Sequence, residues 1–514
     1  MLDEPTPTSP TNRLSRLARP AWLARRRLSG QQAQWLLGVG LVLLLLIVGS
    51  QHTLKVSQAS RLNTQTKSAL LRWLPQVQDA SAGRDIWADY NFPNPPIVAM
   101  LLVPLASLPP LAASLVWLYA KVLLTVWAIL WLFRLIESPQ RPFPVWAKVL
   151  ALLLSLRPIL GDLSHGNINL LILFLIVAML RLDSQRRDWS AGLVLGLAIA
   201  CKVTPALFVP YFLWKRAWRV VAGAALSLAV CLFVVPALWL GPERNLQGLH
   251  SWTRGMIAPY LTGVDEAAAV TVSSGTVYRS IHYNQSLPAT LYRLLTTSHS
   301  FSTFEGDTFV PLRTHALLEL DPASVRWLVK LALVGFALLM GWVCRADRHT
   351  ARPGARVVAE YAIIALGMLI FSERTWKHHC VSLLLPYAVL CYALAYVRSG
   401  LRWRLGLVLT ASLGLIMVTS PGLLGWTVDV GGRALSPQGL LPVYDEASAV
   451  ALVYSPYLGA FLLLLLGCIG CVRAEGGAWV GPPPDGEPAS AGPTAQCEAA
   501  QCEAAQREAA RRLA

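Results

Sequence analysis

Apolar runs of about 18–20 residues recur along most of this chain, which is the pattern of helices that cross a membrane. Six arginines precede the first run, 35–49. We interpret that run as an uncleaved helix rather than a signal peptide, because no small-x-small cleavage site follows it. The later runs predict helices near 112–136, 144–160, 167–182, 187–201, 203–214, 219–240, 324–344, 357–371, 378–398, 405–424 and 452–472. The pattern therefore predicts an all-α polytopic membrane protein with about twelve transmembrane helices.

The turns between the runs indicate how the chain is oriented. With the N-terminus in the cytoplasm, alternation places five basic turns inside, as the positive-inside rule requires: Arg134–Lys148, Arg181–Asp188, Lys215–Arg219, Arg345–Arg356 and Arg398–Arg404. The segments expected outside are 50–111, 161–166, 241–323, 372–377 and 425–451. The short spans 187–201 and 203–214 meet at Lys202, and we expect a tilted or broken pair of helices that lines a cavity there.

Composition agrees with this class and excludes others. The chain of 514 residues is 55% hydrophobic and 14% charged, with a mean hydropathy of +0.49, whereas a soluble domain carries roughly 25% charged residues. Its net charge of +16 lies in short loops, where Lys and Arg meet anionic headgroups. We therefore expect membrane lipids and no nucleic acid as partners. The nine cysteines show no metal-ligand or disulfide spacing, so no metal site is expected.

Three regions follow from these patterns. Residues 1–32 form a basic cytoplasmic tail, residues 33–473 form the membrane domain with long outer loops over 50–111 and 241–323, and residues 474–514 form a low-complexity cytoplasmic tail. The first outer loop ends in an apolar portion that prolines interrupt too often for a plain span. We expect that portion to be a re-entrant or interfacial segment.

Three carboxylates of the first outer loop are candidates for acid–base chemistry. Asp79, Asp85 and Asp89 precede the Pro-rich hairpin, and a carboxylate placed there can deprotonate an acceptor hydroxyl. A solvated loop acid is the plain alternative for any one of them. We take Asp79 and Asp85 as candidate catalytic residues and leave open which is the base. Asp89 and Tyr90 are further candidates.

A second polar cluster, His165-Gly-Asn167-Ile-Asn169, is expected to open a helix from the outer side. The N–H groups and positive dipole end of a helix N-terminus suit a phosphate, whereas N-capping explains one Asn but not the cluster. Lys202 lies between two apolar runs on the same side, where a snorkelling lysine is the alternative. We expect His165, Asn167 and Lys202 to bind the phosphate or sugar of a donor.

The densest cluster places five ionisable groups in one tight outer turn, 373–379. Its Arg and Lys side chains can hold phosphate oxygens, and its histidines can donate to a phosphate or pass a proton. Adjacent residues do not share a helical face, so we expect only one of His378 and His379 to reach the site. Arg374, His378 and His379 are candidate donor-binding residues, and Glu373, Trp376, Asn284 and Gln285 are further candidates.

Longer motifs cover much of the chain. They are Ala-Gly-Arg-Asp-Ile-Trp with the Pro-rich hairpin (82–110), His-Gly-Asn-Ile-Asn-Leu-Leu (165–171), the stretch Ala-Gly-Leu-Val-Leu-Gly-Leu-Ala-Ile-Ala-Cys-Lys-Val-Thr-Pro-Ala-Leu (191–207), Asn-Gln-Ser-Leu from 284 and Trp-Lys-His-His from 376. Over residues 35–472 the chain resembles glycosyltransferase family 87, within the GT-C superfamily of polytopic membrane glycosyltransferases. The 191–207 stretch and Trp-Lys-His-His are the most specific parts of the match.

The resemblance implies a hexosyltransferase that uses a polyprenyl-phosphate sugar as its donor substrate and needs no cofactor. In the best-known members, similar to polyprenol-phosphate-mannose-dependent α-1,2-mannosyltransferases, the sugar is mannose, and the reaction is inverting and metal-independent. A first-loop carboxylate would be the general base, and Lys202, Arg374 and His378 or His379 would stabilise the departing phosphate. The acceptor would be a glycolipid or glycan of the cell envelope. The implied location is a bacterial inner membrane, with the active site facing the periplasm or exterior.

The chain departs from the family pattern near its first outer loop. Family members commonly carry Asp-Phe-x-x-Tyr about a dozen residues before the glycine that matches Gly83, but residues 70–73 here read Leu-Leu-Arg-Trp. Either Asp79 or Asp85 then takes over the base role, or the chain is a non-catalytic paralogue in envelope biogenesis. A lipid or small-molecule transporter or flippase is the remaining alternative, because about twelve spans around a polar site also describe one.

Overall fold

The computed structural model describes residues 46–54, 56–57, 68–258, 281–305, 308–350, 352–397, 399–419 and 450–473. The chain divides into two units, Met1–Asn63 and Thr64–Ala514. In the first unit, residues 46–54 are helical. Most of the expected first helix and both expected tails, 1–32 and 474–514, lie outside the described residues.

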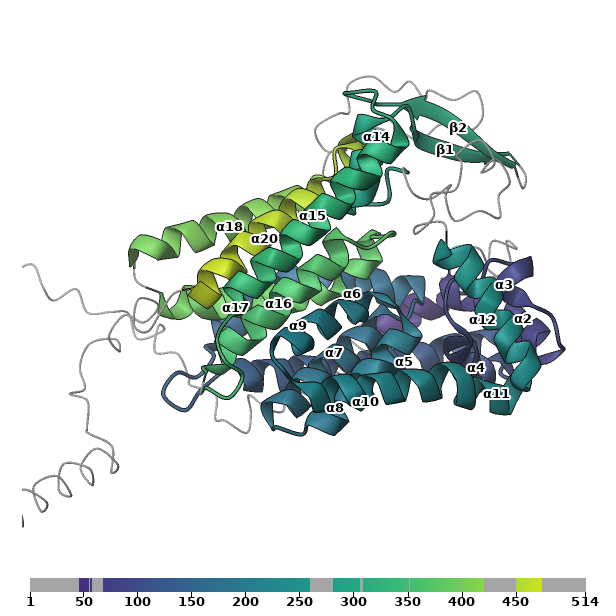
Figure 1. Cartoon of the computed structure of the whole chain (residues 1–514), viewed down its shortest axis with the longest axis horizontal. Coiled ribbons are helices and arrows are strands. Elements are labelled where there is room, and N and C mark those ends of the chain that lie inside the picture. Colours follow the sequence, from purple (N-terminus) through teal and green to yellow (C-terminus); the bar gives the residue numbers. More distant parts are fainter. Residues whose placement is uncertain are drawn as a thin grey trace, which may run out of the picture. The chain divides into compact units, whose positions relative to one another are not determined.

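Helices form nearly all of the second unit that is described (Figure 1). In chain order the elements are α2 (Ala69–Ser81), α3 (Ile86–Asp89), α4 (Pro96–Ala106), α5 (Pro110–Ile136), α6 (Val145–His165), α7 (Asn169–Ser184), α8 (Asp188–Cys201), η3 (Thr204–Leu207), α9 (Phe208–Trp214), α10 (Trp218–Ala229), η4 (Val230–Val234), α11 (Val235–Leu240), α12 (Pro242–Met256), α14 (Leu287–Leu295), β1 (His299–Glu305), β2 (Thr308–Thr314), α15 (Pro322–Val343), α16 (Gly354–Ile370), η7 (Lys377–Leu383), α17 (Leu384–Tyr396), α18 (Ser399–Met417) and α20 (Pro456–Arg473).

The apolar runs form helices close to the predicted positions, which confirms the helical class. Within the described ranges, five helices are long and apolar enough to cross a membrane: Pro110–Ile136, Trp218–Leu240, Pro322–Val343, Lys377–Tyr396 and Pro456–Arg473. Two of these are composite, since one joins α10, η4 and α11 and another joins η7 and α17. The chain is therefore a multi-pass membrane protein, and the figure of about twelve spans stays a prediction.

Two segments expected as outer loops are more helical than the sequence pattern indicated. The first outer loop contains α2, α3 and α4. The segment 161–166 is not a separate loop, because α6 continues to His165 and ends at Gly166, whose φ of 77° lies in the left-handed region. The helix passes through Asp162 because this carboxylate is buried against Lys121 instead of facing solvent.

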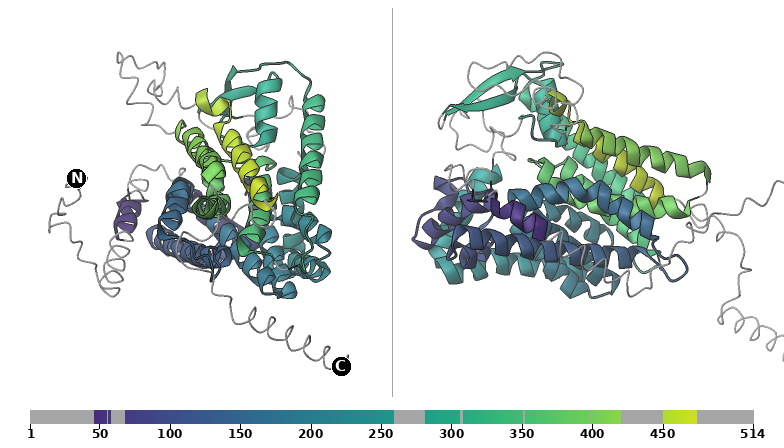
Figure 2. Two further views of the ribbon diagram at one scale, coloured as in Figure 1. Left: turned by 90° about the vertical axis from the view of Figure 1, so that its left-hand side faces the viewer. Right: turned by 180° about the vertical axis from the view of Figure 1, so that it is seen from behind.

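The segments of the two long outer loops pack on each other. Helix α2 contacts α4, and α3 contacts α12, so that these four helices lie together (Figure 1). The indole of Trp87 on α3 donates from Nε1 to the carbonyl of Asn94 at 2.8 Å, and Gly248 of α12 leaves room for its ring. Strands β1 and β2 form an antiparallel hairpin beside the helices (Figure 2). These outer segments are thus folded parts of the second unit.

The tightest helix crossing joins α8 to α10. Gly192 and Gly196 lie four residues apart, in the small-x-x-x-small pattern that lets helix backbones approach closely in membranes. A Cβ added at Gly192 would lie 2.3 Å from the carbonyl oxygen of Val220, and one at Gly196 would lie 2.4 Å from that of Ala224. This crossing fixes the end of α8, directly before Lys202.

Buried ion pairs join the helices around the turn between α15 and α16. Arg348 pairs with Asp183 of α7 and Asp188 of α8, and Glu360 of α16 pairs with Lys215 at 3.0 Å. Removing one member of such a pair leaves an uncompensated buried charge, which costs about 3–5 kcal/mol. These pairs hold together the helix ends at the basic turns Arg181–Asp188, Lys215–Arg219 and Arg345–Arg356.

We predict that Gly192→Ala lowers the stability of the protein, because its methyl group would overlap the backbone of α10. Overpacking of this kind costs about 1–3 kcal/mol. The measurement is the melting temperature of purified protein in detergent. Gly335→Ala is the matched control, since a Cβ at this helical glycine meets nothing within 4 Å. Equal melting temperatures for the two variants would contradict the close crossing.

Candidate active site

Two neighbouring cavities open among the predicted outer turns. The first, which we call the polar chamber, has a volume of 340 Å³ and is lined by residues that include Arg72, Gln76, Tyr90, His165, Trp376 and His378. The second, the apolar chamber, has a volume of 430 Å³ and is lined by residues that include Val203, Leu207, Ile257, Leu333, Met368 and Phe371. Trp73, Pro93, Asn167, Arg374 and His379 line both. The shared wall makes the two chambers parts of one site.

The turn between α6 and α7 builds one side of this site. His165 is the last residue of α6 and Asn169 the first residue of α7, so the expectation that His165 opens a helix is wrong. Lys121 of α5 holds this turn in place, since its ammonium donates to the carbonyl of Asn167 at 3.1 Å. Lys121 also pairs with Asp162 at 3.2 Å, and both side chains are fully buried. Sequence reasoning missed this pair, although each is an isolated charge within an apolar run.

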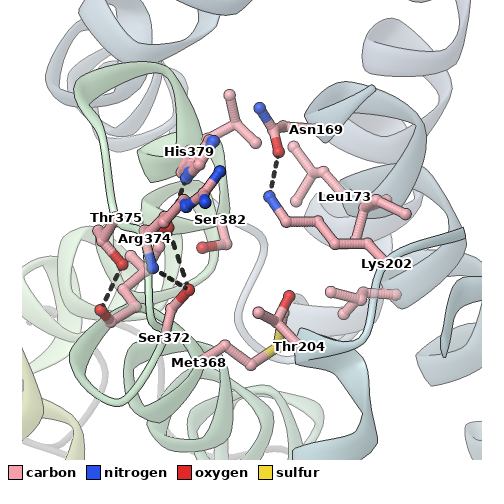
Figure 3. A pocket seen from close by; sticks show the side chains of 14 residues that line it. Asn169, Leu173, Lys202, Thr204, Met368, Ser372, Arg374, Thr375, His379 and Ser382 are labelled. Carbon is pink, nitrogen blue, oxygen red and sulfur yellow. Dashed lines mark hydrogen bonds between the residues drawn. The ribbon is translucent and has the colours of Figure 1, made fainter. Parts of the chain in front are cut away.

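Lys202 reaches the same turn from α8. It lies between α8 and η3, and its ammonium donates to the side-chain oxygen of Asn169 at 2.5 Å (Figure 3). Burial lowers the pKa of Lys202 to about 8, against the opposing influence of the Asp162 carboxylate. Its hydrogen bond goes to a neutral amide, so the positive charge at this position remains available to an anion.

The turn 372–376 and helix η7 build the facing side. Figure 3 shows Arg374 and His379 across from Lys202, around a small pocket of 30 Å³ that all three side chains line. The Nδ1 of His379 lies 2.8 Å from the carbonyl oxygen of Arg374, which can only accept, so this nitrogen is the donor. The ring of His378 stacks on that of His165 with centroids 4.1 Å apart.

Both adjacent histidines line the polar chamber, so the expectation that only one of His378 and His379 reaches the site is wrong. The reason is local geometry. His378 and His379 are the second and third residues of the 3₁₀ helix η7, and their rings lie at 84° to each other. The cavity surrounds the start of this helix, so side chains that point in different directions both border it. Each also has its own polar neighbour, since His378 Nε2 lies 3.4 Å from the amide nitrogen of Asn167.

Asn284 and Gln285 do not line either chamber among the residues described, but hold the turn that carries Arg374. The amide of Asn284 donates to the carbonyl of Glu373 at 2.6 Å and accepts from the backbone N–H of Thr375 at 2.9 Å. The backbone N–H of Gln285 donates to the carbonyl of Thr375 at 2.8 Å. All three side chains, Asn284, Gln285 and Thr375, are fully buried. Both residues are therefore positioning groups.

A fully buried arginine that the sequence analysis did not select anchors this outer segment. Arg293 of α14 donates from Nε to the carbonyl of Val453 at 2.8 Å and from a terminal nitrogen to the carbonyl of Ile281 at 2.9 Å. Burial lowers the pKa of Arg293 to about 9. The anchor joins the second outer loop to residues 450–455, and through Asn284 to the site.

The three candidate aspartates are placed differently from the expectation. In the part of the chain that the structure describes, none of them lines either chamber. Asp85 is the N-cap of α3 and also accepts from the hydroxyl of Ser251 at 2.6 Å, and Asp89 is exposed. Asp79 accepts from the hydroxyl of Tyr90 at 2.6 Å, and Tyr90 does line the polar chamber. Glu373 lines the apolar chamber.

The departure from the family pattern falls in the wall of the site. Arg72 and Trp73, within the four residues where the acid is missing, both line the polar chamber. Together with Lys202 and Arg374, Arg72 makes the site cationic. A cavity with this charge and with an apolar annex suits an anionic group attached to a hydrophobic chain.

Comparisons with known proteins point to one enzyme family. The model of glycosyltransferase family 87 matches residues 92–372. Two curated relatives are named polyprenol-phosphate-mannose-dependent alpha-(1-2)-phosphatidylinositol mannoside mannosyltransferase. The one from Mycolicibacterium smegmatis is 30% identical over 375 residues, which cover 70% of this chain and 71% of the relative. The one from Mycobacterium tuberculosis is 29% identical over 371 residues, which cover the same shares.

A third relative covers less of the chain. It is the polyprenol-phosphate-mannose-dependent alpha-(1-2)-phosphatidylinositol pentamannoside mannosyltransferase of Mycolicibacterium smegmatis, 31% identical over 151 residues, or 29% of this chain and 35% of the relative. No solved structure matches the chain. The family match covers more than half of the sequence and includes His165, Asn167 and Lys202 of the site. The chain belongs to glycosyltransferase family 87, and the expectation that it is a membrane hexosyltransferase is confirmed.

Proposed function

We propose that this protein transfers a hexose, and specifically mannose, from a polyprenyl-phosphate donor to a glycolipid or glycan of the cell envelope. The observation that carries the proposal is the cationic wall where the polar and apolar chambers meet, with Arg374 in the shared wall and Lys202 beside it in the apolar chamber. A donor of this class has the same order of parts: an apolar chain, an anionic phosphate and a polar sugar. The names of the relatives support mannose as the sugar and a glycolipid as the acceptor.

Each part of the donor has a place in this arrangement. The isoprenoid units next to the phosphate occupy the apolar chamber, against Leu207, Leu333 and Phe371. The phosphate lies at the shared wall, near Lys202 and Arg374. The sugar extends into the polar chamber, where the indoles of Trp73 and Trp376 offer faces for stacking.

The proposed chemistry is a single displacement with inversion at the anomeric carbon. Negative charge accumulates on the phosphate as its bond to the sugar breaks. Cations held in place before the reaction stabilise that charge, and Lys202 and Arg374 are the candidates for this role. We propose that the reaction uses no metal ion and no cofactor, because the departing phosphate has protein cations as partners.

We further propose a GT-C-like arrangement of about twelve spans, with the site on the non-cytoplasmic face of a bacterial inner membrane. Two observations support this orientation. The basic turns of the chain lie between helices at the ends remote from the site, as with Arg348 and Lys215. The site itself is built from turns at the other ends of α6, α8 and α16.

Purified protein in lipid is expected to transfer mannose from polyprenyl-phosphate-mannose to an acceptor in a cell-envelope lipid extract. The activity is expected to survive a chelator, because the phosphate is stabilised by side chains. Polyprenyl-phosphate-glucose serves as the comparison donor. If folded protein transfers from neither donor, the transferase proposal fails, and a transporter or non-catalytic role takes its place.

Lys202 predicts a pH dependence of donor binding. Its ammonium, with a pKa near 8, is charged below that pH and loses its proton as the pH rises through it. The KM for the donor is therefore expected to rise above about pH 8, by up to about tenfold per pH unit. Lys202→Arg removes this rise, because arginine stays protonated. Lys330→Ala, a change on the exposed side of α15, is the control and retains the rise in KM. A wild-type KM that stays constant up to pH 10 would count against a contact between Lys202 and the phosphate.

Asn284→Ala is expected to raise the donor KM about tenfold, because the turn that carries Arg374 loses two hydrogen bonds. Asn245→Ala is the matched control. Its amide is equally buried but donates to the carbonyl of Leu232, away from the site. Both variants are expected to lose stability in a melting experiment, and only Asn284→Ala to change the KM. The same KM in both variants would show that the hydrogen bonds of Asn284 to the turn 372–376 support only the fold and not donor binding.

A further inference from the structure

We infer that Tyr90 contacts the acceptor hydroxyl in the polar chamber and relays its proton to Asp79. The inference rests on the proposed function and supplies the base that residues 70–73 lack. Tyr90 lines the polar chamber, and the residue is 38% exposed. Its hydroxyl donates to Oδ2 of Asp79 at 2.6 Å. Asp79 itself lines neither chamber among the described residues, so its contact with the site runs through this tyrosine.

The structure fixes Tyr90 from several sides. Tyr90 is the C-cap of the short helix α3, which Asp85 caps at the other end. Helix α3 packs on α12, where Gly248 accommodates the ring of Trp87. Arg84 donates to the hydroxyl of Tyr90 at 3.1 Å and lies 4.0 Å from Asp79. The phenol therefore has a defined orientation relative to both groups.

The other carboxylates of the region are less suitable. The carboxylate of Asp85 already accepts hydrogen bonds from N–H groups at the start of α3 and from the hydroxyl of Ser251. Asp89 is exposed and outside the chamber lining. Glu373 lines the apolar chamber, where we place the donor chain. Arg72 stands within the segment of the missing acid and cannot accept a proton at neutral pH.

The proton relay balances with the bond changes at the sugar. The acceptor oxygen forms a bond to the anomeric carbon, and the bond from that carbon to the phosphate oxygen breaks. The electron pair leaves with the polyprenyl phosphate. The acceptor proton moves to the hydroxyl oxygen of Tyr90 as the proton of that hydroxyl moves to Oδ2 of Asp79. Asp79, 37% exposed, then releases its proton to water.

Arg84 completes the arrangement without taking part in proton transfer. The hydroxyl of Tyr90 and the carboxylate of Asp79 raise the pKa of Arg84, so it stays a cation. As a donor to the oxygen of Tyr90, it occupies one lone pair of that oxygen and leaves the other for the acceptor hydroxyl. Asp79 and Arg84 are positioning or relay groups, while Tyr90 is the residue expected to touch substrate.

The test is steady-state transfer by Tyr90→Phe and Asp79→Asn in the complete protein, with donor and acceptor varied separately. We expect kcat to fall about 100-fold or more in both, the usual contribution of a general base, while the donor KM is unchanged. Asp79→Glu restores part of kcat, because it keeps a carboxylate near the phenol. Tyr454→Phe and Glu319→Gln, exposed residues outside both chambers, are the matched controls and retain full activity.

Other outcomes overturn the relay. Melting temperatures show that the variants fold, and Asp79→Glu provides a second variant if Asp79→Asn does not. Wild-type kcat in folded Tyr90→Phe would remove Tyr90 from the reaction. A loss of kcat in His165→Gln, with Tyr90→Phe active, would assign the base to a histidine. Absence of transfer by the wild-type protein contradicts the proposed function instead, so the two failures are distinguishable.

Discussion

The ion pair between Lys121 and Asp162 is the contact on which the site depends. Both side chains are fully buried between α5 and α6, with 3.2 Å between ammonium and carboxylate oxygen. The other oxygen of Asp162 accepts from the amide of Asn169 at 2.9 Å, and that amide positions Lys202. Loss of either charged partner would leave one buried charge uncompensated, at a cost of about 3–5 kcal/mol. This buried ion pair thus orders the turn between α6 and α7.

From this pair a chain of polar contacts extends through the site. Asn169 donates to the carbonyl of His378 at 3.2 Å, so the turn after α6 and the start of η7 hold each other. Asn284 then fixes the turn before η7 from the opposite direction. Lys202 is held through the amide oxygen of Asn169. Its charge is therefore available to the phosphate of the proposed donor, as electrostatic stabilisation of a leaving group requires.

The sequence pattern predicted the helices well, because apolar runs in a membrane protein have few alternatives to helix. It also selected Asn167, Arg374 and His379 of the shared wall, and Lys202 of the apolar chamber. Polar and charged residues at the ends of apolar runs are costly in a membrane and therefore indicate a functional site. The pattern did not show that α6 includes Asp162, or that Asn284 and Arg293 support the site from outside. Those features depend on partners more than forty residues away in sequence, which periodicity does not report.

The placement of acids in this chain follows from its charges. Arg72 in the chamber wall adds a cation where related proteins commonly have an acid, and a carboxylate beside it would form an ion pair and be a weaker base. Tyr90 can line the same chamber without such pairing, because a phenol is neutral at physiological pH. Asp79 then provides the negative charge from behind the phenol, outside the chamber lining. Lys202 follows α8 and Arg374 precedes η7, whereas Tyr90 follows α3 and Asp79 belongs to α2. The two cations placed nearest the phosphate and the proton acceptor thereby lie on different segments. Displacement with inversion requires such a separation, because the acceptor hydroxyl attacks one face of the sugar carbon while the phosphate departs from the opposite face.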